Sequence, residues 1–261
     1  MSHIVGLGEH AERVARAFLA EEARWRRHLV VALSGSHAYG FPSPDSDLDL
    51  KAVHIEPTQR LLGLDPKPTT GNRLETVDGV EIDYTSNELQ SVLVGVLQGN
   101  GNYVERILGA PTLSSSPEHE AMRPIVQRAL SQRLYRHYRG FATSQRRELD
   151  VKKTVKRLLY VLRTALTGAH VLRTGEMVPD LTQLVDEHGF AAARELIDAK
   201  RAGEAAPLAP EMAERWVTEV ERALTLLDEA HRASILPPEP ANVPEVEAWL
   251  IAARRDELLR G

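Results

Sequence analysis

The chain of 261 residues contains no cysteine. This absence excludes a disulfide scaffold, a thiolate zinc site, an iron–sulfur cluster and a cysteine nucleophile. Long hydrophobic runs are also missing, because the longest, such as residues 29–33, are far shorter than the roughly 18 residues that a membrane span needs. The first 12 residues have no apolar segment typical of a secretion signal. We therefore expect a soluble, cytoplasmic protein that has no membrane partner.

The charge is unevenly distributed along the chain. Hydrophobic residues make up 43% and charged residues 26%, which is typical of globular proteins and excludes wholesale disorder. The formal net charge is −5, yet residues 121–173 hold thirteen lysines and arginines against two acidic residues. Such a basic segment attracts triphosphates or nucleic acid. The alternative is a solvated helix face that is partly paired with acidic residues from elsewhere in the chain.

Hydrophobic periodicity divides the chain near residue 115. The first part is predicted to contain helices over 9–28 and 87–98, the second capped by Ser86, and strands over 29–34, 47–55, 74–77 and 80–84. Asp78-Gly79 separates the last two strands and indicates a tight primed turn. After Pro117 only helices are predicted, over 122–138, 151–174, 181–188, 190–202, 211–233 and 246–260. Asp150 is the candidate cap of the second of these helices, and Gly175 is its predicted stop. We expect an α+β fold: residues 1–115 form a catalytic domain with a small mixed sheet, and residues 116–261 form a helical domain.

Asp47 and Asp49 are two residues apart on a predicted strand, so both carboxylates project from the same face. Adjacent carboxylates repel each other unless a cation lies between them. Mg²⁺ or Mn²⁺ suits such hard oxygen ligands. Asp83 would complete a two-metal cluster if its strand pairs beside 47–55, and Glu81 on the same face is the competing choice. A cluster of this kind activates an attacking hydroxyl and stabilises a leaving pyrophosphate.

Gly35-Ser36 follows a predicted strand at the start of a helix. Glycine lets the backbone approach a ligand closely, and free N–H groups together with the Ser36 hydroxyl can hold phosphates. Lys51 is expected either to touch a phosphate or to pair with an aspartate. The basic side chains further along either clamp phosphates, guide a nucleic-acid backbone or form a solvated face (Lys152, Lys156, Arg157 and Arg163). His170 and His188 show no spacing typical of metal ligands and are expected to be core or surface histidines.

Gly35-Ser36, ten intervening residues, Asp47-x-Asp49 and a strand-borne Asp83 together resemble the DNA polymerase β-type nucleotidyltransferase superfamily. The segment 34–49 is similar to the branch of nucleotidyltransferases associated with RNA repair pathways, as are residues 100–108 and the basic helix around 152–172. The resemblance covers most of residues 20–190. His37 departs from the pattern, because relatives commonly carry arginine there, although a protonated histidine can also contact phosphate.

The resemblance implies a small mixed sheet with helices, two Mg²⁺ ions, which Mn²⁺ can replace, and a nucleoside triphosphate such as ATP as substrate. Asp47, Asp49 and Asp83 would bind the metal ions, while Gly35, Ser36 and His37 hold the triphosphate with help from the three basic side chains (Lys51, Lys152 and Lys156). A nucleotidyl group would pass to an acceptor hydroxyl with release of pyrophosphate. The expected acceptor is an RNA 3′-hydroxyl, such as that of a tRNA. The alternatives are a small-molecule or protein hydroxyl, or a non-catalytic module that binds nucleotide or RNA.

Overall fold

A computed structural model of the chain describes residues 7–64, 66, 69–203, 207–208 and 210–260. Backbone contacts group the chain into two compact units. The first unit comprises Met1–Gly35, Asp47–Ala129 and Pro240–Gly261, and the second comprises Ser36–Ser46 and Leu130–Glu239. The units are therefore interleaved in sequence, whereas hydrophobic periodicity predicts one division near residue 115. Periodicity reports which face of a helix is buried, and it does not report the element against which that face packs.

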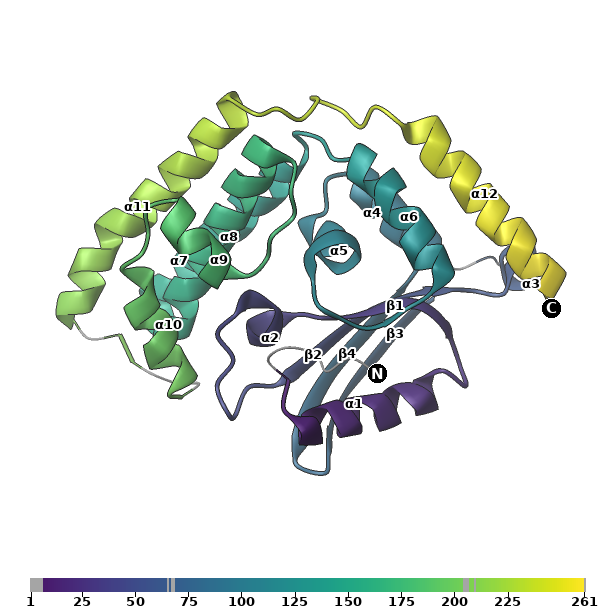
Figure 1. The fold of residues 1–261 in the computed structure, drawn as a ribbon, viewed down its shortest axis with the longest axis horizontal. Helices are drawn as coiled ribbons and strands as arrows, with labels where there is room; N and C mark the ends of the chain where they lie inside the picture. Colours follow the sequence, from purple (N-terminus) through teal and green to yellow (C-terminus); the bar gives the residue numbers. More distant parts are fainter. Residues whose placement is uncertain (1–6, 65, 67–68, 204–206, 209, 261) are drawn as a thin grey trace. The chain divides into compact units, whose positions relative to one another are not determined.

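The first unit contains a five-stranded mixed sheet in the order β3-β4-β2-β1-β5 (Figure 1). The strands are β1 (Arg27–Leu33), β2 (Leu48–Ile55), β3 (Thr70–Val77), β4 (Val80–Glu88) and β5 (Thr112–Ser115). Strands β2 and β4 are parallel, and the other neighbours are antiparallel. The predicted turn joins β3 to β4, with φ angles of 48° at Asp78 and 80° at Gly79, as a primed hairpin turn requires. The predicted mixed sheet is confirmed.

Helices cover both faces of this sheet. Helix α1 (Glu9–Glu22) lies along one face in Figure 1, and α4 (Leu89–Leu97), α5 (Gly101–Val104), the π-helical turn η1 (Glu105–Gly109) and α6 (Pro117–Arg128) lie on the other. Helix α12 (Val243–Arg260) packs against α3 (Thr58–Leu61), α4 and α6. The last helix of the chain thus belongs to the unit that contains the sheet.

The second unit is helical. It is built on α8 (Val155–Thr174), of whose twenty residues fifteen are buried. Four helices pack around α8: α7 (Leu134–Lys152), α9 (Leu181–Glu187), α10 (Ala193–Arg201) and α11 (Pro210–Arg232). Helices are the only regular elements described after β5, so the predicted helical C-terminal region is confirmed. Among the described helices none is long and apolar enough to cross a membrane.

Side-chain capping moves several predicted helix boundaries. Ser86 lies in β4 and does not cap α4; Glu88 does, accepting a hydrogen bond from the Gln90 amide at 2.7 Å. The predicted helix 122–138 is divided between α6 and α7. Helix α7 extends to Lys152, Lys153 is left-handed with φ 44°, and Thr154 caps α8 in place of Asp150. Gly175 ends α8 in the left-handed conformation, as predicted.

Candidate active site

Two strands bring together the aspartates that the sequence places 34 residues apart. Asp49 on β2 and Asp83 on β4 are direct partners in the parallel register. Their neighbours Leu48, Leu50 and Ile82 are buried and point to the opposite face, because side chains alternate along a strand. Both carboxylates therefore project from the same face of the sheet, the arrangement that the sequence predicts only on condition that these strands pair.

Lys51 connects the two carboxylates. Its Nζ lies 3.0 Å from Asp83 Oδ1 and 3.7 Å from Asp49 Oδ1. The side chains of Asp49, Lys51 and Asp83 are 27%, 20% and 47% exposed, so solvent reaches all three. Of the two roles considered for Lys51, pairing with aspartates is the one observed. The Lys51 ammonium group offsets the repulsion between the two carboxylates. Because the site is partly buried, that repulsion is several times stronger than it would be in bulk water.

Gly35 approaches the Asp49 side chain closely. A Cβ atom at Gly35 would lie 1.9 Å from Asp49 Oδ2, and the residue adopts a φ of 59°. The adjacent Ser34 amide donates a hydrogen bond to the Asp49 carbonyl at 2.9 Å, which holds the end of β1 against β2. Only glycine satisfies both the backbone angle and the space at this position. The glycine selected from the sequence for phosphate binding therefore lies against the Asp49 carboxylate, and its contact with phosphate stays a prediction.

Two further acidic residues lie near the ends of these strands. Asp47 is exposed and precedes the first residue of β2 directly. Glu81 is exposed on β4, where its register partner is Thr76 on β3. Asp83, by contrast, has Asp49 as its partner on β2. The register thus favours Asp83 over Glu81 as the third carboxylate.

An arginine that sequence analysis missed lies further along the aspartate-bearing face. Arg106 in η1 donates hydrogen bonds of 2.8 Å to the Ala52 carbonyl and to Asn87 Oδ1. It is buried, and burial lowers the pKa of its guanidinium to about 10. Arg106 ties η1 to the two central strands. No periodic pattern indicates a π-helical turn, so the sequence carried no signal for this contact.

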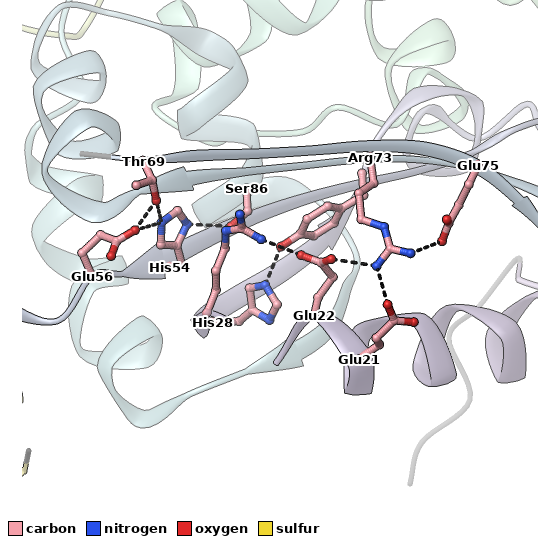
Figure 2. Close-up of polar contacts among 11 residues, drawn as sticks. Glu21, Glu22, His28, His54, Glu56, Thr69, Arg73, Glu75 and Ser86 are labelled. Carbon is pink, nitrogen blue, oxygen red and sulfur yellow. Dashed lines mark hydrogen bonds and ion pairs between the residues drawn. The ribbon is translucent and has the colours of Figure 1, made fainter. Parts of the chain in front are cut away.

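The opposite face of the sheet carries a polar cluster that the sequence also did not reveal. Figure 2 shows it between the strands and α1. His28 Nε2 lies 2.6 Å from the Tyr84 hydroxyl, and His54 Nδ1 lies 2.7 Å from Ser86 Oγ. Arg73 pairs with Glu21, Glu22 and Glu75 at 3.0, 2.9 and 2.6 Å. Burial, followed by the neighbouring His54, lowers the pKa of His28 to about 4.

The remaining predicted ligands belong to the second unit. Ser36 is buried in α2 (Gly35–Tyr39), where its carbonyl accepts a hydrogen bond from the Phe41 amide, and His37 is half-buried in the same helix. Lys152 is exposed at the end of α7, and Lys156 is half-buried in the first turn of α8. A role for these four residues in nucleotide binding stays a prediction.

Ion pairs neutralise much of the basic segment within the second unit. Arg157 pairs with Glu148 at 2.7 Å, and Arg139 pairs with Asp228 at 2.9 Å. Arg163 is buried, with its guanidinium 3.8 Å from the centre of the Tyr39 ring. Three exposed basic side chains lie at the end of α7 (Arg147, Lys152 and Lys153), and three more are exposed elsewhere in the segment (Arg128, Arg136 and Arg173). The segment thus combines both predicted alternatives, a paired helix face and a short cationic patch.

The mixed sheet, the aspartate pair and the surrounding helices define an α+β fold of the nucleotidyltransferase type. Residues 11–252 match the RNA repair pathway DNA polymerase beta family, and the chain belongs to that family.

One similar protein and one solved structure add little about function. An uncharacterized protein of Methanocaldococcus jannaschii, MJ0002, is 32% identical over 158 residues, which are 59% of this chain and 64% of the relative. This chain therefore spans less than two thirds of that relative's length. The crystal structure of a nucleotidyltransferase-like protein from Exiguobacterium sibiricum covers 94% of this chain and 80% of its own, with 11% identity and a TM-score of 0.34. Such a distant structural likeness carries no argument about the site.

Proposed function

We propose that this protein is a metal-dependent nucleotidyltransferase that moves a nucleoside monophosphate from a nucleoside triphosphate to an acceptor hydroxyl and releases pyrophosphate. The observation that carries the proposal is the register pairing of Asp49 with Asp83, with Lys51 Nζ 3.0 Å from one carboxylate and 3.7 Å from the other. Membership of the RNA repair pathway DNA polymerase beta family supports the reaction class.

The residues present fit a hard divalent cation. Asp49 and Asp83 offer carboxylate oxygens from one face, and the exposed Asp47 adds a third carboxylate at the start of β2. All three are the oxygen ligands that Mg²⁺ and Mn²⁺ prefer. When bound, two such ions would supply charge stabilisation for the triphosphate and for the attacking oxygen.

The side chains of this chain divide the remaining work. Asp83 would receive the proton of the acceptor hydroxyl, since it is the register partner of Asp49 and its side chain is 47% exposed to solvent. Gly35 and Ser36 would hold the triphosphate through backbone N–H groups and the serine hydroxyl, and His37, Lys51, Lys152 and Lys156 would contribute positive charge. Alignment of the acceptor oxygen with the α-phosphate then provides most of the rate enhancement.

For the acceptor we propose the 3′-hydroxyl of an RNA. The family description refers to an RNA repair pathway. The exposed Arg147, Lys152 and Lys153 at the end of α7 form a cationic patch that suits a phosphodiester backbone. Because these contacts carry no base information, the proposal does not extend to an RNA sequence.

The experiment incubates the protein with each of four α-³²P nucleoside triphosphates and Mg²⁺, together with total RNA and a protein extract. The control is Asp47→Ala, whose exposed side chain can be truncated without opening the core. RNA that is labelled by wild type but not by the variant would establish both the transfer and the acceptor. Label on protein or a small molecule would support nucleotidyl transfer but overturn the proposal that RNA is the acceptor. Absence of any Asp47-dependent label with all four nucleotides would overturn the proposal that the protein is a nucleotidyltransferase.

A further inference from the structure

Three potential metal ligands converge in the second unit, where α9 packs on α8. His170 lies in α8, Glu187 is the last residue of α9, and His188 follows it as the C-cap. One nitrogen or oxygen atom from each of the three side chains lies within 4.8 Å of the other two. His170 Nδ1 is 3.2 Å from Glu187 Oε1, and the two imidazole rings meet edge to face with centroids 5.6 Å apart.

Three of the four histidine nitrogens at this cluster are buried without hydrogen-bond partners. His170 is 5% exposed. Within the described part of the chain, neither of its ring nitrogens makes a hydrogen bond, and the buried Nε2 of His188 makes none either. Buried polar atoms are almost always satisfied, and each exception needs an explanation such as an ion. Three such nitrogens beside one carboxylate point to a ligand that is shared among them.

The backbone around the cluster is held in place. Gly189 adopts a φ of 74°, which ends α9 immediately after His188. The Gly189 carbonyl accepts a hydrogen bond of 2.8 Å from Arg222 on α11. His170 is flanked in α8 by the fully buried Ala169 and Val171. His170 is thus fixed by packing and needs little reorganisation to bind an ion, whereas the side chains of the exposed Glu187 and the half-buried His188 can adjust.

We propose that His170, Glu187 and His188 bind one transition-metal ion of the Zn²⁺ type, with water as a further ligand. Two imidazole nitrogens and one carboxylate oxygen suit Zn²⁺. They do not suit Mg²⁺, which prefers oxygen ligands alone. Metal–ligand bonds of about 2.0–2.1 Å place tetrahedral ligand atoms roughly 3.3 Å apart. His170 Nδ1 and Glu187 Oε1 already have about that separation, at 3.2 Å. Rotation of the His188 side chain would bring its ligand atom to a similar distance from the other two.

One carboxylate of the cluster and one neighbouring arginine set the charge around it. Arg173 is a nearby positive charge, and it faces Glu229 at 4.0 Å. The Glu187 carboxylate supplies the negative charge that the ion needs.

This site is separate from the proposed nucleotidyl-transfer site. All three of its residues belong to the second unit, whereas Asp47, Asp49 and Asp83 belong to the first. It also differs in ligand chemistry, since nitrogen donors select a different class of ion. A metal here would join the C-terminal end of α9 to α8 and stabilise the helical unit.

The test uses the full chain without a histidine tag, stripped of metal by a chelator and then supplied with excess Mg²⁺ to occupy the carboxylate site. Zn²⁺ is titrated by calorimetry, and Co²⁺ is followed through its visible spectrum. We expect one equivalent per chain, a rise in the thermal unfolding midpoint and a Co²⁺ spectrum typical of nitrogen ligation. Glu187→Ala and His188→Gln should each weaken binding by at least about 10–100-fold, since even residues behind the ligands contribute that much.

The matched control is His10→Gln, which removes an exposed histidine from α1 in the first unit. It should bind Zn²⁺ as wild type does. Circular dichroism of the metal-free variants establishes that they fold. Folded Glu187→Ala and His188→Gln proteins that retain wild-type affinity would overturn the proposal, as would a wild type that binds no equivalent of Zn²⁺. Neither result depends on nucleotidyl transfer.

Discussion

Asp49 and Asp83 face each other across the parallel strands β2 and β4, and the Lys51 ammonium lies between their carboxylates at 3.7 and 3.0 Å. Two carboxylates on adjacent strands gain nothing for stability by themselves, because like charges directly opposite each other are unfavourable. The pair therefore needs a cation. Lys51 supplies one, and it must share the carboxylates with any divalent ion that binds there.

Competition between Lys51 and a divalent ion is directly testable. We expect Lys51→Met to increase the affinity for Mn²⁺ by about 5-fold, because removing an ion pair worth about 1 kcal/mol frees the carboxylates. The measurement is a Mn²⁺ titration followed by electron paramagnetic resonance.

The control for that titration is Lys152→Met, which removes one positive charge from the exposed end of α7. It should leave the Mn²⁺ affinity unchanged. Equal affinity in wild type and Lys51→Met would mean that the ion does not bind at the two carboxylates that Lys51 contacts.

Gly35→Ala tests the close approach of the backbone to Asp49. Both Gly35 and Gly79 have positive φ angles, but only Gly35 has a neighbour where a Cβ would lie, and Gly79 has open space. Gly79→Ala should therefore cost about 1–3 kcal/mol of backbone strain, and Gly35→Ala should cost about 1–3 kcal/mol more through overpacking. Urea unfolding of the two variants measures the difference. Equal losses would contradict the packing of Asp49 on Gly35.

Local chemistry allowed part of this fold to be predicted. Asp78-Gly79 defines its hairpin because both residues tolerate positive φ, and Gly175 ends α8 for the same reason. Neither β5 nor the interleaving of the two units has such a local signal. Strand β5 has only four residues, and its pairing with β1 is a long-range contact. Tertiary packing decides these features, and hydrophobic periodicity does not encode it.

The candidate site shows the same limit. Asp47 and Asp49 are a local pattern, so their shared strand could be read from spacing. Whether Asp83 or Glu81 is the partner depends on the register between β2 and β4, which only the structure provides. His170 and His188 were expected to be ordinary histidines because their separation along the chain matches no ligand motif. Their proximity follows from the packing of α9 on α8.

Stability should fall as the pH decreases from about 6.5 to 4. Burial lowers the pKa of His28 to about 4 in the folded state, whereas an unfolded histidine titrates near 6.5. The unfolded chain therefore binds more protons in this window, and each proton favours unfolding. The contribution of His28 is at most about 3 kcal/mol.

His28→Gln should flatten the dependence of the free energy of unfolding on pH, measured by urea denaturation at several pH values. His10→Gln removes an exposed histidine and should leave the wild-type slope in place. A slope that is unchanged in His28→Gln would show that other groups cause the acid sensitivity.

The buried ion pair between Arg254 and Glu88 should anchor α12 to the sheet-containing unit. Glu88 is fully buried, caps α4 and pairs with Arg254. Arg254→Met would leave a buried carboxylate without its partner and should cost about 3–5 kcal/mol. Arg255→Met on the exposed side of α12 is the control and should cost less than about 0.5 kcal/mol. Similar losses in the two variants would contradict the anchoring role.

The most direct test of the central claim is the rate of transfer of an α-³²P-labelled nucleotide by wild type and three carboxylate variants under Mg²⁺. The account predicts that Asp49→Asn and Asp83→Asn each lose at least about 10²–10³-fold in rate, comparable to the removal of one electrostatic group from a transition state. Glu81→Gln, two residues from Asp83 on the same strand, should retain activity close to that of wild type. A fully active Asp83→Asn protein, or an inactive Glu81→Gln protein, would contradict the assignment of the paired aspartates as the catalytic centre.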